Sequence, residues 1–194
     1  MVLSDMKKQL FFYFFSFILS VSSFSQIKIE REFKIQKKEV PKPAVSFIDS
    51  IKTKHIKWYK EINEDRETYE AKFHFKGKEY SIEFDTTGKI YDVEFIISTK
   101  SIASHALKKI TTHLDSTFQN WKFEKIQLQY TGSEKALMKS VKNGTEQDIQ
   151  QIYEIVIDCN DNGTFKSYEY TFNTMGEKIE QKEIIEPQTI HLDY

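Results

Sequence analysis

The sequence predicts an α+β protein of two tandem units, each with one helix packed on a four-stranded antiparallel sheet. Three observations predict this fold. Residues 69–97 alternate apolar and polar side chains across two glycine turns, as a three-stranded meander does. A shorter version of the pattern, a single hairpin with longer strands, returns at residues 152–172 around Asn162-Gly163. Between them, residues 101–118 carry an apolar stripe at helical spacing, which would cover the dry face of a sheet.

The turns of the first meander predict its strand register. Counting outward from a two-residue turn at Lys76-Gly77 places each apolar residue opposite another. The predicted pairs are Phe73–Tyr80, Ala71–Ile82 and Tyr69–Phe84. A second turn at Thr87-Gly88 predicts three more, which are Phe84–Tyr91, Ile82–Val93 and Tyr80–Phe95. The three strands would therefore share one aromatic face.

The opposite face of this meander is polar and mixed in charge. It carries Lys72, His74, Lys76, Glu79, Ser81, Glu83, Asp92 and Glu94. Such a face suits either plain solvation or a polar contact with another protein, because composition alone does not distinguish the two. Trp58 and Trp121 could form a stacking platform for a ligand, but the alternation around them favours core packing.

The second unit has the same pairing pattern. Counting from Asn162-Gly163 predicts the opposing pairs Ile157–Tyr168, Ile155–Tyr170 and Tyr153–Phe172. Gly176 then corresponds to Gly88, since each follows a phenylalanine by four residues. In the last strand, Gln181 and Glu183 fall at positions where the first unit is apolar. We therefore expect this strand to be a ragged edge of the sheet.

Residues 1–25 have the form of a secretory signal peptide. Two lysines precede the apolar run LFFYFFSFILSV, and Ser-Phe-Ser before Gln26 is a small-x-small cleavage site. The alternative, a membrane anchor, requires about 20 apolar residues, and this run is shorter. We therefore expect an exported protein, periplasmic or secreted, without a membrane span once the signal peptide is removed.

Composition narrows the function further. The chain has 194 residues with 28 basic and 29 acidic side chains, and 169 residues remain without the signal peptide. The near-neutral balance leaves no electrostatic footprint for nucleic acid and no polybasic patch for a membrane. Cys159 is the only cysteine, so an exported chain has to fold without an internal disulfide.

We divide the rest of the chain into four parts. Residues 26–40 are a lead-in segment or loose edge strand, 41–100 the first unit, 101–186 the second unit and 187–194 a C-terminal tail. Residues 131–148 have no counterpart in the first unit. They form an insertion at a hairpin tip, with a short predicted helix from Ser133 to Val141. Insertions of this kind often carry individual function.

Four blocks of the first unit resemble one protein family. They are the stretch Pro41 to Val45, W-x-K-E at Trp58 to Glu61, YEAKF at Tyr69 to Phe73 and F-D-x-x-G at Phe84 to Gly88. These blocks resemble the PepSY-like proteins described as beta-lactamase-inhibitor-like, which are common among exported bacterial proteins. In the second unit, the tryptophan block reads W-K-F-E at Trp121 to Glu124, and Asn173 replaces the aspartate.

The resemblance covers residues 41–186. It implies a helix on a four-stranded antiparallel sheet, twice, and allows the two sheets to continue into one curved surface. Related domains bind or restrain other proteins, including peptidases, rather than catalyse reactions. The shared motifs are fold signatures, so they nominate no catalytic residue.

The sharpest local motif is DCNDNGTFKSYE, which has the spacing of a calcium loop. Its ligands would be Asp158, Asn160, Asn162 and Glu169. Both flanks alternate like strands, however, and the hairpin register sets Asp158 opposite Ser167, with Glu169 diagonally beyond. A bare hairpin tip is therefore the favoured interpretation, and calcium binding is the alternative.

The histidines and the cysteine form no catalytic or metal-binding constellation in the sequence. His105 and His113 are eight residues apart on the predicted helix, about 12 Å along its axis. The other histidines, which have no acidic or thiol constellation around them, are His55, His74 and His191. Nothing near Cys159 would lower its pKa. The chain also lacks a G-x-S-x-G elbow and a phosphate loop.

The sequence therefore predicts an exported, non-catalytic module that binds another protein, in particular as an inhibitor or regulator of a peptidase or other envelope enzyme. A small-ligand or calcium-binding envelope protein is the first alternative, and an uncharacterised hydrolase is the second. No cofactor, metal or catalytic residue is predicted. The sequence does not indicate the binding residues or the identity of the partner.

Overall fold

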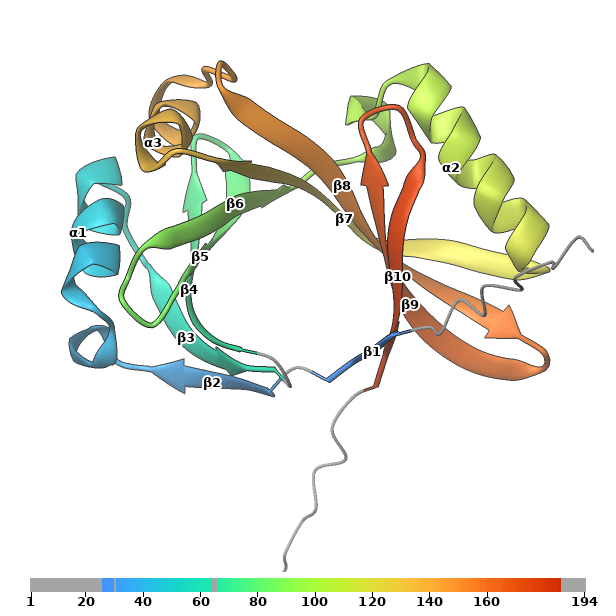
Figure 1. Ribbon diagram of the computed structural model, residues 1–194, viewed down its shortest axis with the longest axis horizontal. Coiled ribbons are helices and arrows are strands. Elements are labelled where there is room, and N and C mark those ends of the chain that lie inside the picture. The colour runs from blue at the N-terminus through green and yellow to red at the C-terminus, as the bar shows by residue number, and fades with distance from the viewer. Residues whose placement is uncertain (1–25, 30, 64–65, 186–194) are drawn as a thin grey trace, which may run out of the picture.

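The computed structural model describes residues 26–29, 31–63 and 66–185. The predicted signal peptide, residues 1–25, and the predicted tail, residues 187–194, lie outside the described residues. The described chain forms a single ten-stranded sheet with three α-helices on one of its faces (Figure 1). No helix among these residues has the length and apolar character needed to cross a membrane.

The strands follow chain order across the sheet, apart from the first. They are β1 (Gln26–Lys28), β2 (Arg31–Ile35), β3 (Lys57–Ile62), β4 (Glu67–Phe75), β5 (Lys78–Phe84), β6 (Ile90–Ile96), β7 (Asn120–Gly132), β8 (Ile149–Asp161), β9 (Thr164–Asn173) and β10 (Lys178–Ile184). Strands β2 to β10 form one antiparallel meander, and β1 adds in parallel beside β10. The strands predicted for two sheets therefore continue into one curved sheet, because β6 pairs with β7.

The helices lie on the convex face of this sheet (Figure 1). They are α1 (Lys42–Ile51), α2 (Ser104–Thr117) and α3 (Glu134–Asn143), with short 3₁₀ turns at Lys37–Glu39 and Thr99–Ser101. Helices α1 and α3 pack with β3 to β6 in one core, where Ile48, Phe84 and Leu137 are fully buried. Helix α2 packs on the second half, where Ile110 and Tyr170 are fully buried. Each helix buries residues three or four positions apart, as an amphipathic helix does.

Most of the predicted register is confirmed. The three pairs counted from Lys76-Gly77, the three counted from Asn162-Gly163, and the pairs Ile82–Val93 and Tyr80–Phe95 are all present. The prediction for Phe84 is wrong, because this residue lies opposite Ile90 rather than Tyr91. The Asp85 carboxylate accepts hydrogen bonds from the backbone N–H groups of Thr87 and Lys89, which makes the connection longer than a two-residue turn. The register shifts there, and the Tyr91 side chain is 44% exposed rather than buried in the aromatic core.

Gly88 and Gly176 do play equivalent roles. Both have positive φ angles, of 84° and 77°, and both lie against the start of a helix. A Cβ on Gly88 would approach the backbone nitrogen of Ala44 in α1 to 2.9 Å, and one on Gly176 would approach the backbone oxygen of Ala106 in α2 to 2.4 Å. The turns that follow Phe84 and Phe172 thus need glycine for their conformation and for the close approach of the helix.

The predicted lead-in segment has a larger role than expected. It supplies β2, hydrogen-bonded to β3 at one edge of the sheet, and β1, hydrogen-bonded to β10 at the other. Only residues 29 and 30 separate these two strands in sequence. The segment therefore joins the two edges of the sheet, which curves round into a nearly closed ring (Figure 1). The prediction that the last strand is an edge is wrong, since β1 covers it.

The predicted insertion contains α3, and the predicted helix is confirmed. The Ser133 side chain caps it by accepting a hydrogen bond from the Ala136 backbone N–H at 3.2 Å. Leu137 and Val141 of α3 are buried in the core of the first half. The insertion thus completes a core that α1 covers only in part.

Candidate functional site

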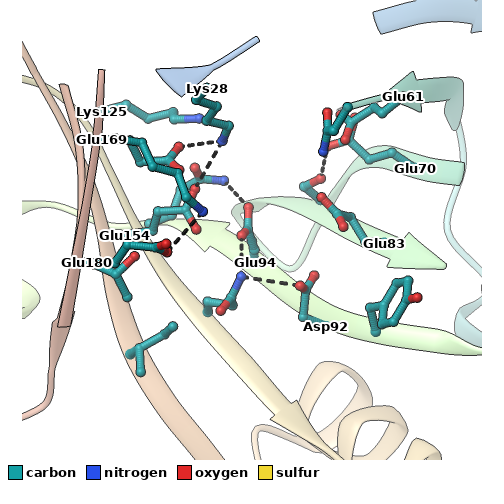
Figure 2. A pocket seen from close by; sticks show the side chains of 18 of the residues that line it. Lys28, Glu61, Glu70, Glu83, Asp92, Glu94, Lys125, Glu154, Glu169 and Glu180 are labelled. Atoms are coloured by element: carbon teal, nitrogen blue, oxygen red, sulfur yellow. Dashed lines mark hydrogen bonds and ion pairs between the residues drawn. The ribbon is translucent and has the colours of Figure 1, made fainter. Parts of the chain in front are cut away.

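The concave face of the sheet encloses a cavity of about 940 Å³, which we call the central cavity. Acidic side chains on its wall outnumber basic ones by ten to five. The acidic residues are Glu32, Glu61, Glu70, Glu79, Glu83, Asp92, Glu94, Glu154, Glu169 and Glu180, and the basic residues are Lys28, Arg66, Lys72, Lys125 and Lys182. Figure 2 shows side chains from both halves of the chain converging there. The cavity is therefore strongly negative, although the whole chain has a net charge of only −1.

Strand alternation explains why this wall is polar. The residues between the buried aromatic ones point to the other face of each strand. Six of the eight residues predicted on the polar face line the cavity, namely Lys72, Glu79, Ser81, Glu83, Asp92 and Glu94. His74 instead lies near the end of β4 with an exposed side chain. In the structure the predicted polar face is thus an interior wall.

Near β1, two acidic side chains share one lysine. The Lys28 ammonium lies 2.6 Å from Glu169 Oε2 and 3.8 Å from Glu154 Oε1 (Figure 2). Burial raises the pKa of Glu169 to about 7, and the negative charge of Glu154 adds to this effect. Burial also raises the pKa of Glu154, and the negative charge of Glu94 raises it further. One lysine does not neutralise this pair.

On β6, Asp92 and Glu94 are held by amide groups rather than by cations. Gln129 Nε2 donates to Asp92 Oδ2 at 3.2 Å and to Glu94 Oε1 at 2.8 Å, and Gln127 Nε2 donates to Glu94 Oε2 at 2.7 Å (Figure 2). Burial raises the pKa of Asp92 well above its usual range, and the charges of Glu83 and Glu94 raise it further. The pKa of Glu94 is raised by burial first and by Glu83 second.

A third acidic group has the spacing of a metal site but already holds a cation. One carboxylate oxygen from each of Glu32, Glu61 and Glu70 lies within 4.8 Å of the others. The Lys72 ammonium lies 2.9 Å from Glu70 and 3.2 Å from Glu32, and stands 4.9 Å from the centre of the Tyr59 ring. Burial lowers the pKa of Lys72, but the charges of Glu70 and Glu32 outweigh it and leave the pKa raised. This lysine therefore supplies a positive charge to two of the three carboxylates.

The residues of the predicted calcium loop do not converge. Asp158 Oδ1 accepts a hydrogen bond from Ser167, its cross-strand partner as predicted, and Asn160 Oδ1 accepts one from the Gly163 backbone N–H. Glu169 points into the central cavity instead, where it binds Lys28. The segment is the hairpin tip between β8 and β9. In its register Asp158 lies opposite Ser167 and Glu169 lies opposite Val156, so the two carboxylates do not meet around an ion.

The other candidates of the sequence belong to the core or the surface. Trp58 is buried in the first core, as alternation predicted, whereas Trp121 is partly buried and donates to Asp115 at 2.9 Å. His113 packs on the rings of Tyr170 and Phe172, and burial lowers its pKa. Burial raises the pKa of the Cys159 thiol to about 11, so it stays protonated. His55 and His105 are exposed, and His191 lies outside the described residues.

Several wall residues were not assigned to the predicted polar face, although Glu169 was considered as a calcium ligand. Lys28 and Glu32 come from the predicted lead-in segment, and Glu154 and Glu169 come from the second hairpin. Extending the polar alternation of the first meander to the second hairpin would have found the last two. No sequence signal places Lys28 beside them, because β1 reaches β10 only when the ring closes.

Comparison with known proteins identifies the fold. No family model matches the chain, and no curated protein matches its sequence. Its fold is similar to a DUF2874 family protein from Bacteroides uniformis, with 11% identity and a TM-score of 0.53 over 74% of this chain and 89% of the other. A Bacteroides eggerthii protein provisionally described as periplasmic has 12% identity and a TM-score of 0.52, covering 74% and 88%. A BLIP-like protein from Bacteroides fragilis has 14% identity and a TM-score of 0.48, covering 78% of this chain and 92% of the other.

Proposed function

We propose that this protein is an exported, non-catalytic module that binds another protein through its concave face and acts as an inhibitor or regulator of a peptidase or other envelope enzyme. The observation that supports this best is the acidic wall of the central cavity, where Asp92, Glu154 and Glu169 have raised pKa values. Burying like charges together costs stability. A wall that served only the fold would be better built from neutral residues, so a binding role explains these residues more simply.

The other parts of the proposal concern export and organisation. Residues 1–25 act as the signal peptide, residues 41–100 and 101–186 are two tandem PepSY-like units, and residues 131–148 are an insertion in the second. The matched roles of Gly88 and Gly176 against α1 and α2 support the tandem organisation. The fold similarity to a provisionally periplasmic protein supports export.

The test is affinity capture with matched variants. The purified protein is immobilised, and proteins retained from the envelope and secreted fractions of its host are identified by mass spectrometry. The cavity variant is Asp92→Asn with Glu94→Gln, and the control is Glu124→Gln with Glu134→Gln, which neutralises two exposed carboxylates outside the cavity. We expect a saturable partner, in particular a peptidase or other enzyme, that the control retains and the cavity variant loses. A partner bound equally by both variants would place the interface elsewhere.

A further inference from the structure

We propose that the central cavity recognises a basic segment of the partner protein, with lysine or arginine side chains inserted between Asp92 and Gln127. This inference rests on the proposed function, since it names the chemistry of the partner that the concave face would bind. It also identifies the part of the wall where binding is centred, the neighbouring strands β6 and β7.

The unpaired polar atoms on the wall indicate a ligand that donates hydrogen bonds. Three buried side-chain atoms on the wall have no hydrogen-bond partner: Asn63 Oδ1, Asp92 Oδ1 and Gln127 Oε1. All three are acceptors, and Asp92 and Gln127 are more than nine-tenths buried. Glu70 Oε2 also lacks a hydrogen bond but is ion-paired with Lys72. Among the described residues, no buried side-chain donor on the wall lacks a partner. Leaving such acceptors unmet is costly, so a donor group entering the cavity would gain from each.

The positions of these acceptors favour an extended ligand over a single ion. In the β6–β7 register, Gln127 lies opposite Ile96, four residues along the strand from Asp92, which corresponds to about 13 Å. Glu94 lies between them. A calcium ion takes about six to eight oxygen ligands gathered within about 2.6 Å of it. Side-chain cations on an extended peptide recur every second residue, about 7 Å apart, and can reach acceptors spaced along a strand.

Charge and apolar contact agree with this occupant. The wall has an excess of five carboxylates over cations. Four partly exposed apolar side chains also line the cavity, namely Ile27, Tyr91, Ile96 and Ile179, each between 40% and 57% exposed. Lysine and arginine carry long methylene stems that pack on apolar surface while their charged ends reach polar groups. The acidic wall and these partly exposed apolar side chains together match lysine and arginine side chains better than they match a metal ion.

The test uses a defined probe, the capped peptide Gly-Arg-Gly-Arg-Gly, titrated into the purified protein and followed by calorimetry or NMR. The matched neutral probe replaces both arginines by citrulline, which keeps the shape and removes the charge. We expect saturable binding of the arginine peptide only, weakened about 30-fold or more by Asp92→Asn, the effect of losing one partner of a buried charge pair. Gln127→Met should also weaken binding, whereas Glu124→Gln should leave it unchanged.

Other outcomes would overturn the inference. They are the absence of saturable binding, equal binding of the citrulline peptide, and unchanged binding by the Asp92→Asn variant while it remains folded. Competition by millimolar CaCl₂ would assign the cavity to a metal ion, and tighter binding of spermine would assign it to a polyamine. The capture experiment separates these results from the proposed function, because a partner lost by the cavity variant would still show protein binding there.

Discussion

The two faces of the sheet are built from alternate residues of the same strands, yet they have opposite energetics. On the convex face, Phe84 and Tyr170 are fully buried against helices, and burial of their apolar area stabilises the fold. On the concave face, Asp92 and Glu169 are nearly as buried, but their charged forms are disfavoured. Burial of a side chain therefore stabilises the fold on the convex face, whereas on the concave face it lowers the stability of the folded protein when the carboxylates are charged. Four experiments test this contrast.

The largest effect is expected on the convex face, from Phe84→Ala. The Phe84 ring lies 5.7 Å from that of Phe47 in α1 and 6.2 Å from that of Trp58, measured between centroids. Removing a buried phenylalanine costs about 3–5 kcal/mol. Urea unfolding should show this loss. Phe165→Ala is the control, since Phe165 is 80% exposed, and it should change the free energy of unfolding by less than about 0.5 kcal/mol. Equal effects would contradict the assignment of the core.

The concave face should make the protein less stable as pH rises. Glu169, with a pKa of about 7, faces Lys28, Glu154 and Lys182. Between its ordinary pKa of 4.5 and about 7, the folded state keeps a proton that the unfolded state has lost. Its contribution is complete below pH 4.5 and lost as pH rises through about 7, a change of about 1–3 kcal/mol. Asp92, Glu94 and Glu154 act in the same direction.

Thermal unfolding measured from pH 5 to pH 8 tests this expectation. The melting temperature should fall across the range. Asp85 and Asp158 have lowered pKa values, so their contributions are lost only below pH 4 and do not affect this window. The lowered pKa of His113 acts in the opposite direction below its ordinary value of 6.5, so the fall should be clearest between pH 6.5 and pH 8. A melting temperature that rises from pH 5 to pH 8 would show that the cavity carboxylates are not protonated in the folded state.

Lys28→Met should sharpen the contrast by removing the cation that β1 supplies. Without it, Glu154 and Glu169 repel each other at pH 8, and we expect a loss of about 1–2 kcal/mol there, discounted because the lysine side chain is 20% exposed. At pH 5, where the carboxyl groups are protonated, the loss should be smaller. Urea unfolding at both pH values measures the difference. An equal loss at both would indicate a packing effect of the methylene stem.

The smallest effect should be a gain, from Asp92→Asn. The substitution keeps the shape and removes a charge that Glu83 and Glu94 disfavour. We expect about 0.5–1 kcal/mol of stabilisation at pH 8, because the neutral amide avoids the cost of burying a charge beside other carboxylates. Glu124→Gln, on an exposed carboxylate, should have no measurable effect. Destabilisation by Asp92→Asn would mean that the carboxylate supports the fold rather than binding.

The sequence predicted local pairing well because turns and alternation act over short distances. The pair Tyr153–Phe172 lies nine residues from its turn on each strand, and its register still follows from Asn162-Gly163. The pair Phe84–Tyr91 failed because one side chain, Asp85, reorganised the turn through its own hydrogen bonds. Six of the residues that line the cavity were on the predicted polar face, but nothing in their alternation showed that this face is enclosed.

Sequence alone determined most of the strands, the helices, most of the hairpin register and which residues of these strands share a face. These features depend on side-chain period and turn chemistry, which are local. Only the tertiary structure decided that the sheets join at β6 and β7, that α3 fills the first core, and that β1 closes the ring beside β10. That closure depends on contacts between residues more than 140 positions apart, such as Lys28 and Glu169, and it turns a polar surface into an acidic cavity.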